Sequence, residues 1–191
     1  SDHGYNMGHN GIWHKGNGHW ILKKDSLPLA TENIPAGQRP NMYDNSLRVP
    51  TCVVWPGVTK PGTRIDSSVT NLDWYPTMQE IAGGSSAEKK IVRGRDLSTL
   101  LTGSADGWDD EVFAQYSTRH QSKTHMRCYR TSKWKLVRDF NDPQRDELFN
   151  LIADPSETTN LIDQQQHQAI VTLLHAKLLS KMKEINDPAL P

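Results

Sequence analysis

Cysteine is scarce in this sequence: Cys52 and Cys128 are the only two in 191 residues, and no Cys-x-x-Cys pair occurs. Two thiols exclude the kind of disulfide framework that staples small secreted domains. Hydrophobic runs are short, and none approaches the length of a membrane-spanning helix. Neither sign of charge dominates, because Lys plus Arg and Asp plus Glu both number 22. Composition therefore gives no indication of a nucleic-acid or anionic-lipid partner.

Hydrophobic residues are also few, at 35% of the chain. The sequence is neither low in complexity nor highly charged, so disorder does not account for this value. Six Trp and eleven Pro instead indicate long ordered loops over a scaffold. A chain of 191 residues suffices for one ordinary domain or for a piece of a larger one.

Hydrophobic periodicity separates a loop-rich first part from a last part made of strands and a helix. Residues 5–45 show no sustained period, so we expect a long loop that builds a functional site. The tail predicts a small antiparallel sheet packed under one helix. The expected elements are a buried strand at 49–57, helices within 71–84 and 93–103, short strands within 111–117, 125–140 and 146–151 with a turn at 131–133, and a helix at 164–185 capped by Asp163.

Basic residues alternate along the expected strands in "MRCYRTSKWKLVR". This pattern is more typical of the solvated face of a sheet than of a nucleic-acid site. Arg48, which follows "YDNS", is expected in a structural ion pair.

The opening residues 1–17, "SDHGYNMGHNGIWHKGN", carry the most chemistry. Asp2 and His3 are adjacent, and at a strand end where the chain turns at Gly4 both could approach one metal ion. Lys15 follows twelve residues after His3 and offers a compact cation for an anionic group. Glycines at 4, 8 and 11 would let the backbone pass close to a ligand.

Other side chains of this stretch have weaker interpretations. Trp13 and Tyr5 would supply rigid walls, and His14 could face a substrate. A zinc site of His9, His14 and His19 is disfavoured, because their spacing matches no standard zinc pattern. Gly16–Gly18 invites a phosphate-loop interpretation, but no strand-to-helix context supports it.

"DHG-x3-G-x2-G-x-W-x-K" resembles the second half of the type I sulfatase active site, in the alkaline-phosphatase-like superfamily. Four further segments are similar to that family in the same order: "YDNSLRVPTCVVWPGV", "VTNLDWYPTMQEIAG", "GRDLSTLLTG" and "ELFNLIADPSETTNL". The resemblance implies an α/β fold, with residues 1–110 as the C-terminal part of the large α/β domain and 111–191 as a C-terminal subdomain of antiparallel strands plus a helix.

The resemblance also implies roles. Asp2 and His3 match the family's ligands of Ca²⁺ or another divalent cation, and Lys15 matches the lysine that contacts the sulfate group. The expected partner is a small-molecule or carbohydrate sulfate ester, and family likeness favours a periplasmic or secreted location.

The family's nucleophile is a formylglycine made from Cys-x-Pro-Ser-Arg, and this sequence has no such motif. The serine version nearest to it, "SLPLA" at 26–30, lacks the arginine. We therefore expect the formylglycine in a missing N-terminal half, and the 191-residue chain alone to be inactive. The alternatives are a phosphonate monoester or phosphodiester hydrolase of the same superfamily and a non-catalytic remnant.

Overall fold

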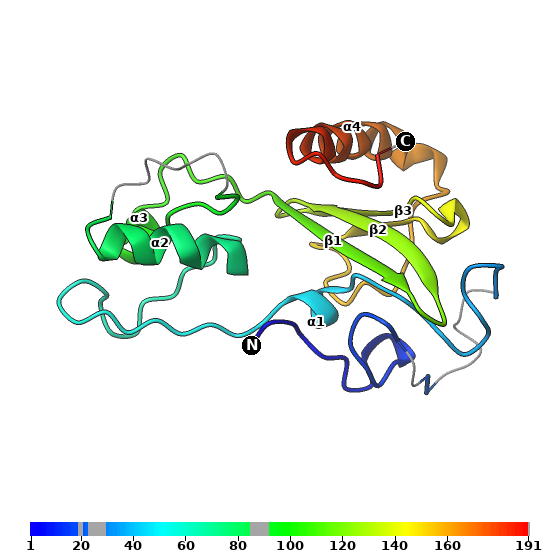
Figure 1. Cartoon of the computed structure of the whole chain (residues 1–191), viewed down its shortest axis with the longest axis horizontal. Coiled ribbons are helices and arrows are strands. Elements are labelled where there is room, and N and C mark those ends of the chain that lie inside the picture. The colour runs from blue at the N-terminus through cyan, green and yellow to red at the C-terminus, as the bar shows by residue number, and fades with distance from the viewer. Residues whose placement is uncertain (19–20, 23–29, 85–91, 191) are drawn as a thin grey trace. The chain divides into compact units, whose positions relative to one another are not determined.

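The protein is described by a computed structural model that covers residues 1–18, 21–22, 30–84 and 92–190 (Figure 1). Clustering of contacts divides it into unit 1, formed by Ser1–Val49 with Phe113–Pro191, and unit 2, formed by Pro50–Val112. The sequence-based division between 110 and 111 stays a prediction. Among the described residues, none of the helices combines the length and apolar character that a bilayer crossing requires.

Unit 1 is built on one sheet whose strands follow the order β1-β2-β3-β4. The strands are Val112–Arg119, Lys123–Arg130, Trp134–Asp139 and Glu147–Asn150. β3 pairs antiparallel with both β2 and β4. The turn expected at 131–133 is confirmed, because the Thr131 N–H donates to the Trp134 carbonyl across it at 2.8 Å.

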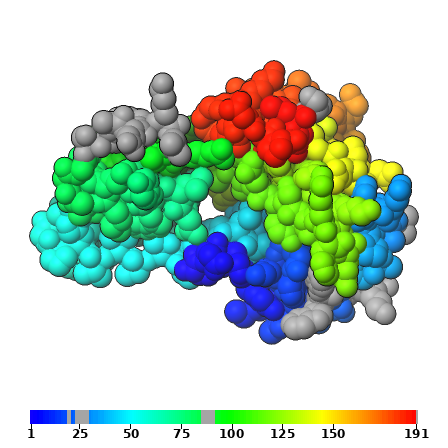
Figure 2. Space-filling model, viewed as in Figure 1, coloured from blue at the N-terminus to red at the C-terminus, as the bar shows by residue number. Residues whose placement is uncertain are grey.

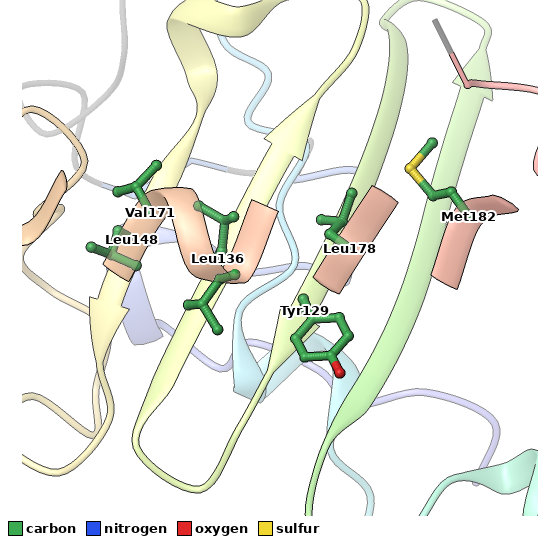
Figure 3. Close-up of a cluster of buried hydrophobic side chains, with 7 residues drawn as sticks. Tyr129, Leu136, Leu148, Val171, Leu178 and Met182 are labelled. Atoms are coloured by element: carbon green, nitrogen blue, oxygen red, sulfur yellow. The ribbon is translucent and has the colours of Figure 1, made fainter. Parts of the chain in front are cut away.

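Helix α4, Gln168–Glu184, covers one face of this sheet (Figures 1 and 3). Its buried side chains pack on Tyr129, Leu136 and Leu148, which are paired across β2, β3 and β4 and therefore lie on one face of the sheet. The shared cluster is Tyr129, Leu136, Leu148, Val171, Leu174, Leu178 and Met182. The expected cap was wrong: a short 3-10 turn, Gln165–His167, lies between Asp163 and α4, and α4 has no side-chain cap at its start.

The opposite face of the sheet is covered by residues from the loop-rich first part. Met42 packs with Met126, Cys128 and Val137, whereas Ile12 and Tyr43 pack with Phe149 and Leu151. The short α-helix α1, Asp44–Leu47, lies in this part. The sheet therefore lies between α4 and the segment that precedes and includes α1.

Unit 2 holds a 3-10 turn at Asn71–Asp73, helix α2 at Trp74–Ile81 and helix α3 at Ser98–Leu101. Its core is Leu97, Leu100 and Leu101 with the partly buried Val53, Trp55, Trp74 and Trp108. The strand expected at 49–57 was wrong: residues 51–55 form no strand in the described structure, and a turn follows at Pro56 and Gly57. Burial of Val53 and Trp55 explains its apolar pattern, whereas a strand also needs a neighbour for its backbone hydrogen bonds.

Candidate active site

The opening segment is fixed to α1 by its backbone. The Gly4 N–H donates to the Ser46 carbonyl at 2.9 Å, and the Asn6 N–H donates to the His14 carbonyl at 3.0 Å. Gly4 has no room for a side chain, because a Cβ there would lie 2.3 Å from the Asn45 carbonyl oxygen. The glycine of Asp-His-Gly is thus required by a close approach of two backbones.

The three residues with the sharpest predicted roles lie together. Lys15 Nζ is 3.1 Å from His3 Nε2, and His3 Nε2 is 3.9 Å from Asp2 Oδ2. The Asp2 side chain is 90% exposed and His3 is partly exposed, at the surface where Figure 2 shows the first residues of the chain in dark blue. A loop of twelve residues thus returns the lysine to the Asp-His pair.

The hydrogen bonds of His3 define its tautomer. Its Nδ1 lies 2.7 Å from the Gly4 carbonyl oxygen, which can only accept, so Nδ1 carries the proton. The Lys15 ammonium can only donate, so the Nε2 it approaches carries the lone pair. A backbone carbonyl that fixes Nδ1–H and orients Nε2 outward is the usual arrangement behind a metal-binding histidine.

Asp2 is biased toward its ionised form. Its pKa lies below the usual value, chiefly because its own backbone N–H donates to the carboxylate. Lys15 lowers the pKa further. An exposed carboxylate held ionised is a suitable hard donor for a divalent cation.

Asp2 and His3 provide two of the ligands that a divalent cation needs. Asp2 supplies oxygen and His3 supplies Nε2, but in the described ranges no group of three or more His, Cys, Asp or Glu side chains is arranged so that it could hold a metal ion. Ca²⁺ takes six to eight oxygen ligands. The described residues fit one side of such a site, and Lys15 is bonded to the Nε2 lone pair that an ion would use.

Tyr5, Trp13 and His14 belong to the same opening segment as Asp2, His3 and Lys15. The rings of Tyr5 and His14 lie 6.0 Å apart between centroids, tilted by 41°. Tyr5 and Trp13 are both exposed. Their assignment to a substrate stays a prediction, as do the roles of His14, Lys15, Asp2 and His3.

The described residues of the two disfavoured alternatives make other contacts. His9 Nδ1 accepts from the Met7 N–H at 3.3 Å, His14 lies against Tyr5, and His19 lies outside the described residues. Gly18 is explained by packing, because its φ is +56° and a Cβ there would meet the Arg39 carbonyl oxygen at 2.1 Å.

Burial raises the pKa of the Cys128 thiol to about 12, so this thiol is protonated and inert at neutral pH.

The expectation of a solvated basic face was wrong. Lys135 and Arg127 are fully or almost fully buried, and Arg130 and Arg138 are only partly exposed. Arg127 donates from Nε and Nη2 to the two oxygens of Asp187, at 2.6 and 2.8 Å. Each buried cation faces a carboxylate from a distant part of the chain, which strand alternation alone cannot reveal. Arg48 does form an ion pair, 3.8 Å from Asp44, as expected.

The chain is similar to known proteins in sequence and in fold. A family model described as N-sulphoglucosamine sulphohydrolase, C-terminal, matches residues 38–184. The steryl-sulfatase of Rattus norvegicus is 30% identical over 157 residues, which cover 78% of this chain and 25% of that protein.

Two solved structures have the same fold. A putative sulfatase from Bacteroides thetaiotaomicron VPI-5482 gives a TM-score of 0.70 at 22% identity, over 80% of this chain and 33% of that one. A protein solved with its substrate D-glucosamine-2-N,6-O-disulfate gives 0.66 at 23% identity, over 81% and 32%. The chain thus spans about a quarter to a third of the length of the proteins it matches.

The sheet with its covering helix and its structural neighbours define the class of fold, the α/β fold of these solved structures. Within this class the chain belongs to the sulfatase family, since the family model matches most of its length.

Proposed function

We propose that this chain supplies Asp2, His3 and Lys15 to the active site of an enzyme that hydrolyses sulfate esters of an organic substrate, most simply a sulfated carbohydrate. The observation that carries the proposal is the contact of Lys15 with His3 beside Asp2. The sugar preference is supported by the structural neighbour solved with a glucosamine disulfate.

Each residue has a defined task in this proposal. Asp2 and the outward-facing Nε2 of His3 would hold a divalent cation together with ligands from outside this chain. That cation would offset the negative charge of the sulfate oxygens. Lys15 would donate to a sulfate oxygen, and Tyr5, Trp13 and His14 would bound the organic part of the ester. A formylglycine nucleophile would come from a part of the enzyme with the Cys-x-Pro-Ser-Arg motif, so residues 1–110 would complete the large domain and 111–191 would form a C-terminal subdomain.

The test is the kinetics of Lys15→Ala in the natural enzyme. A charge that acts more strongly in the transition state lowers kcat when it is lost, so kcat should fall roughly a hundredfold or more. Lys15→Arg should not restore activity, because a planar guanidinium does not replace a compact ammonium. Lys183→Ala, at an exposed position of α4, is the matched control and should leave kcat unchanged. Wild-type kcat in Lys15→Ala would refute the assignment.

The reaction class is tested with aryl sulfate and aryl phosphodiester substrates in parallel. Faster turnover of the sulfate supports the proposal, and faster turnover of the phosphodiester supports the phosphohydrolase alternative. Turnover of neither by the natural enzyme identifies a non-catalytic protein. The 191-residue chain alone is expected to turn over neither, since it has no nucleophile motif.

A further inference from the structure

A buried network of charges lies between α1 and the sheet of unit 1. Lys135 on β3 is fully buried, and its Nζ donates to Asp44 Oδ1 at 2.9 Å and to Glu157 Oε1 at 2.6 Å. Arg130 on β2 donates from Nε and Nη2 to the two oxygens of Asp44, at 3.2 and 3.0 Å. With the exposed Arg48, 3.8 Å from Asp44, three cations lie around the two carboxylates.

Stability alone does not explain four charges at this place. Removing charges from water is costly, and a well-packed apolar set of similar volume is often as stable or more stable than a buried ion network. Ionic networks have a second property, which is that they fix one arrangement of the segments they join. The segments that this network joins are α1, β2, β3 and the turn that contains Glu157.

Glu157 joins the most distant of these segments. Its Oε2 accepts from the backbone N–H of Asp44, the first residue of α1, at 2.5 Å. Its backbone has φ of +55°, a left-handed conformation that is unfavourable for a residue with a Cβ. The same turn binds the opening segment directly, because Asn10 Nδ2 donates to the carbonyls of Ser156 and Glu157 at 3.0 and 3.1 Å.

Ser46 carries this anchoring from α1 to the candidate active site. Its carbonyl accepts from the Gly4 N–H, next to His3, at 2.9 Å. Its Oγ accepts from Asn6 Nδ2 at 2.6 Å, and the same Nδ2 donates to the carbonyl of His14, next to Lys15, at 3.0 Å. The His3 end of the loop is thus bonded directly to the buried Ser46 on α1, and the Lys15 end is connected to the same serine through Asn6.

We propose that Glu157 is a positioning residue for the active site: through Asp44, Lys135 and Ser46 it fixes the loop that brings Lys15 to His3. The inference rests on the proposed function of His3 and Lys15. The turn after β4 then has a role in the reaction although it contributes no side chain to the substrate. A small displacement of reacting groups costs large factors in rate, so the expected loss appears in kcat.

The first test is amide hydrogen exchange of the natural enzyme without substrate. Glu157→Gln keeps the shape of the side chain but removes the charge that faces Lys135. Asp187→Asn is the matched control, because it breaks the buried pair of Arg127 and Asp187, whose hydrogen bonds in the described structure go to residues 115–189. Exchange at Gly4 and Asn6 should be at least tenfold faster in Glu157→Gln than in Asp187→Asn, compared at equal global stability. Equal exchange in the two variants would overturn the proposal.

Kinetics provide the second test. In Glu157→Gln, kcat for a sulfate ester should fall about ten- to a hundredfold with little change in KM, the range seen when partners of site residues are lost. Asp187→Asn should retain kcat once it is folded. An unchanged kcat in Glu157→Gln would also overturn the proposal. A natural enzyme without any sulfatase turnover would refute the proposed function, whereas the exchange measurement would still decide whether Glu157 fixes the loop.

Ser46→Ala tests the same connection if the Glu157→Gln variant fails to fold. It leaves every member of the buried network intact and removes the Oγ that accepts from Asn6. Faster exchange at Asn6 supports the route through Ser46, and wild-type exchange there refutes it.

Discussion

The two compact units bury their apolar residues to different extents. Unit 1 has a sheet with apolar clusters on both faces and two buried ion networks. In unit 2 the described cluster is small, and α2 with its preceding turn leaves an apolar row exposed, formed by Leu72, Tyr75, Met78 and Ile81. Unit 1 can thus fix the candidate active site with its own contacts, whereas burial within unit 2 does not account for the helical pattern of α2.

The largest expected effect is loss of Lys135. Lys135→Met leaves Asp44 and Glu157 buried without their shared cation, which should lower the free energy of unfolding by about 3–5 kcal/mol. Lys133→Met, two residues away and exposed, should change it by less than about 0.5 kcal/mol. Urea unfolding of both variants checks the difference, and similar midpoints would show that the buried network contributes little to unit 1.

Apolar packing gives the next effect. Leu178→Ala removes a fully buried side chain from the α4 cluster and should cost roughly 2–5 kcal/mol. Met78→Ala on α2 removes a side chain that is more than half exposed and should cost less than about 0.5 kcal/mol. A cost for Met78→Ala as large as that for Leu178→Ala would show that the row on α2 is covered in solution.

Backbone crowding gives a third comparison, between Gly4 of unit 1 and Gly62 of unit 2. Gly4→Ala would place a Cβ 2.3 Å from the Asn45 carbonyl oxygen, so it should cost up to about 3 kcal/mol and displace His3. Gly62→Ala in unit 2 meets nothing within 4 Å and should cost only about 1 kcal/mol, from its φ of +74°. Thermal unfolding gives the stabilities. Sulfatase turnover should be lost in Gly4→Ala alone, and turnover retained there would contradict the close approach.

The smallest effect is a dependence on pH. Burial opposes the charge of Asp187, but bonds from Arg127, the Ala189 N–H and Gln115 more than offset it and lower its pKa to about 2. Between about pH 4 and pH 2 the unfolded chain therefore binds more protons than the folded one. Stability should fall by about 2 kcal/mol as the pH is lowered through this window.

Unfolding by urea at stepped pH measures this slope. Asp187→Asn should flatten it, whereas Asp66→Asn, in an exposed pair with Arg64, should leave it as in the wild type. An unaltered slope in Asp187→Asn would assign the acid sensitivity to other carboxylates.

Local sequence signals predicted much of unit 1. The short strands, the turn at 131–133 and the last helix depend on residues near one another in the chain, and all three are confirmed. The expected strand at 49–57 failed because an apolar run does not specify whether a neighbouring strand exists. The Asp163 cap failed because an additional 3-10 turn moved the start of the helix.

The sequence by itself determined the family and the residues of the opening segment, because Asp-His-Gly, the spaced glycines and the lysine are adjacent in the chain. Only the tertiary structure decided that Lys15 contacts His3 and that the Gly4 backbone lies against the Asn45 carbonyl of α1. It also decided that Lys135 is buried against Asp44 and Glu157. The partners in that network lie 22 to 113 residues apart, and the alternation of a strand gives the face of a side chain without giving what covers that face. Burial of a charge depends on that cover, which forms only when distant segments pack together.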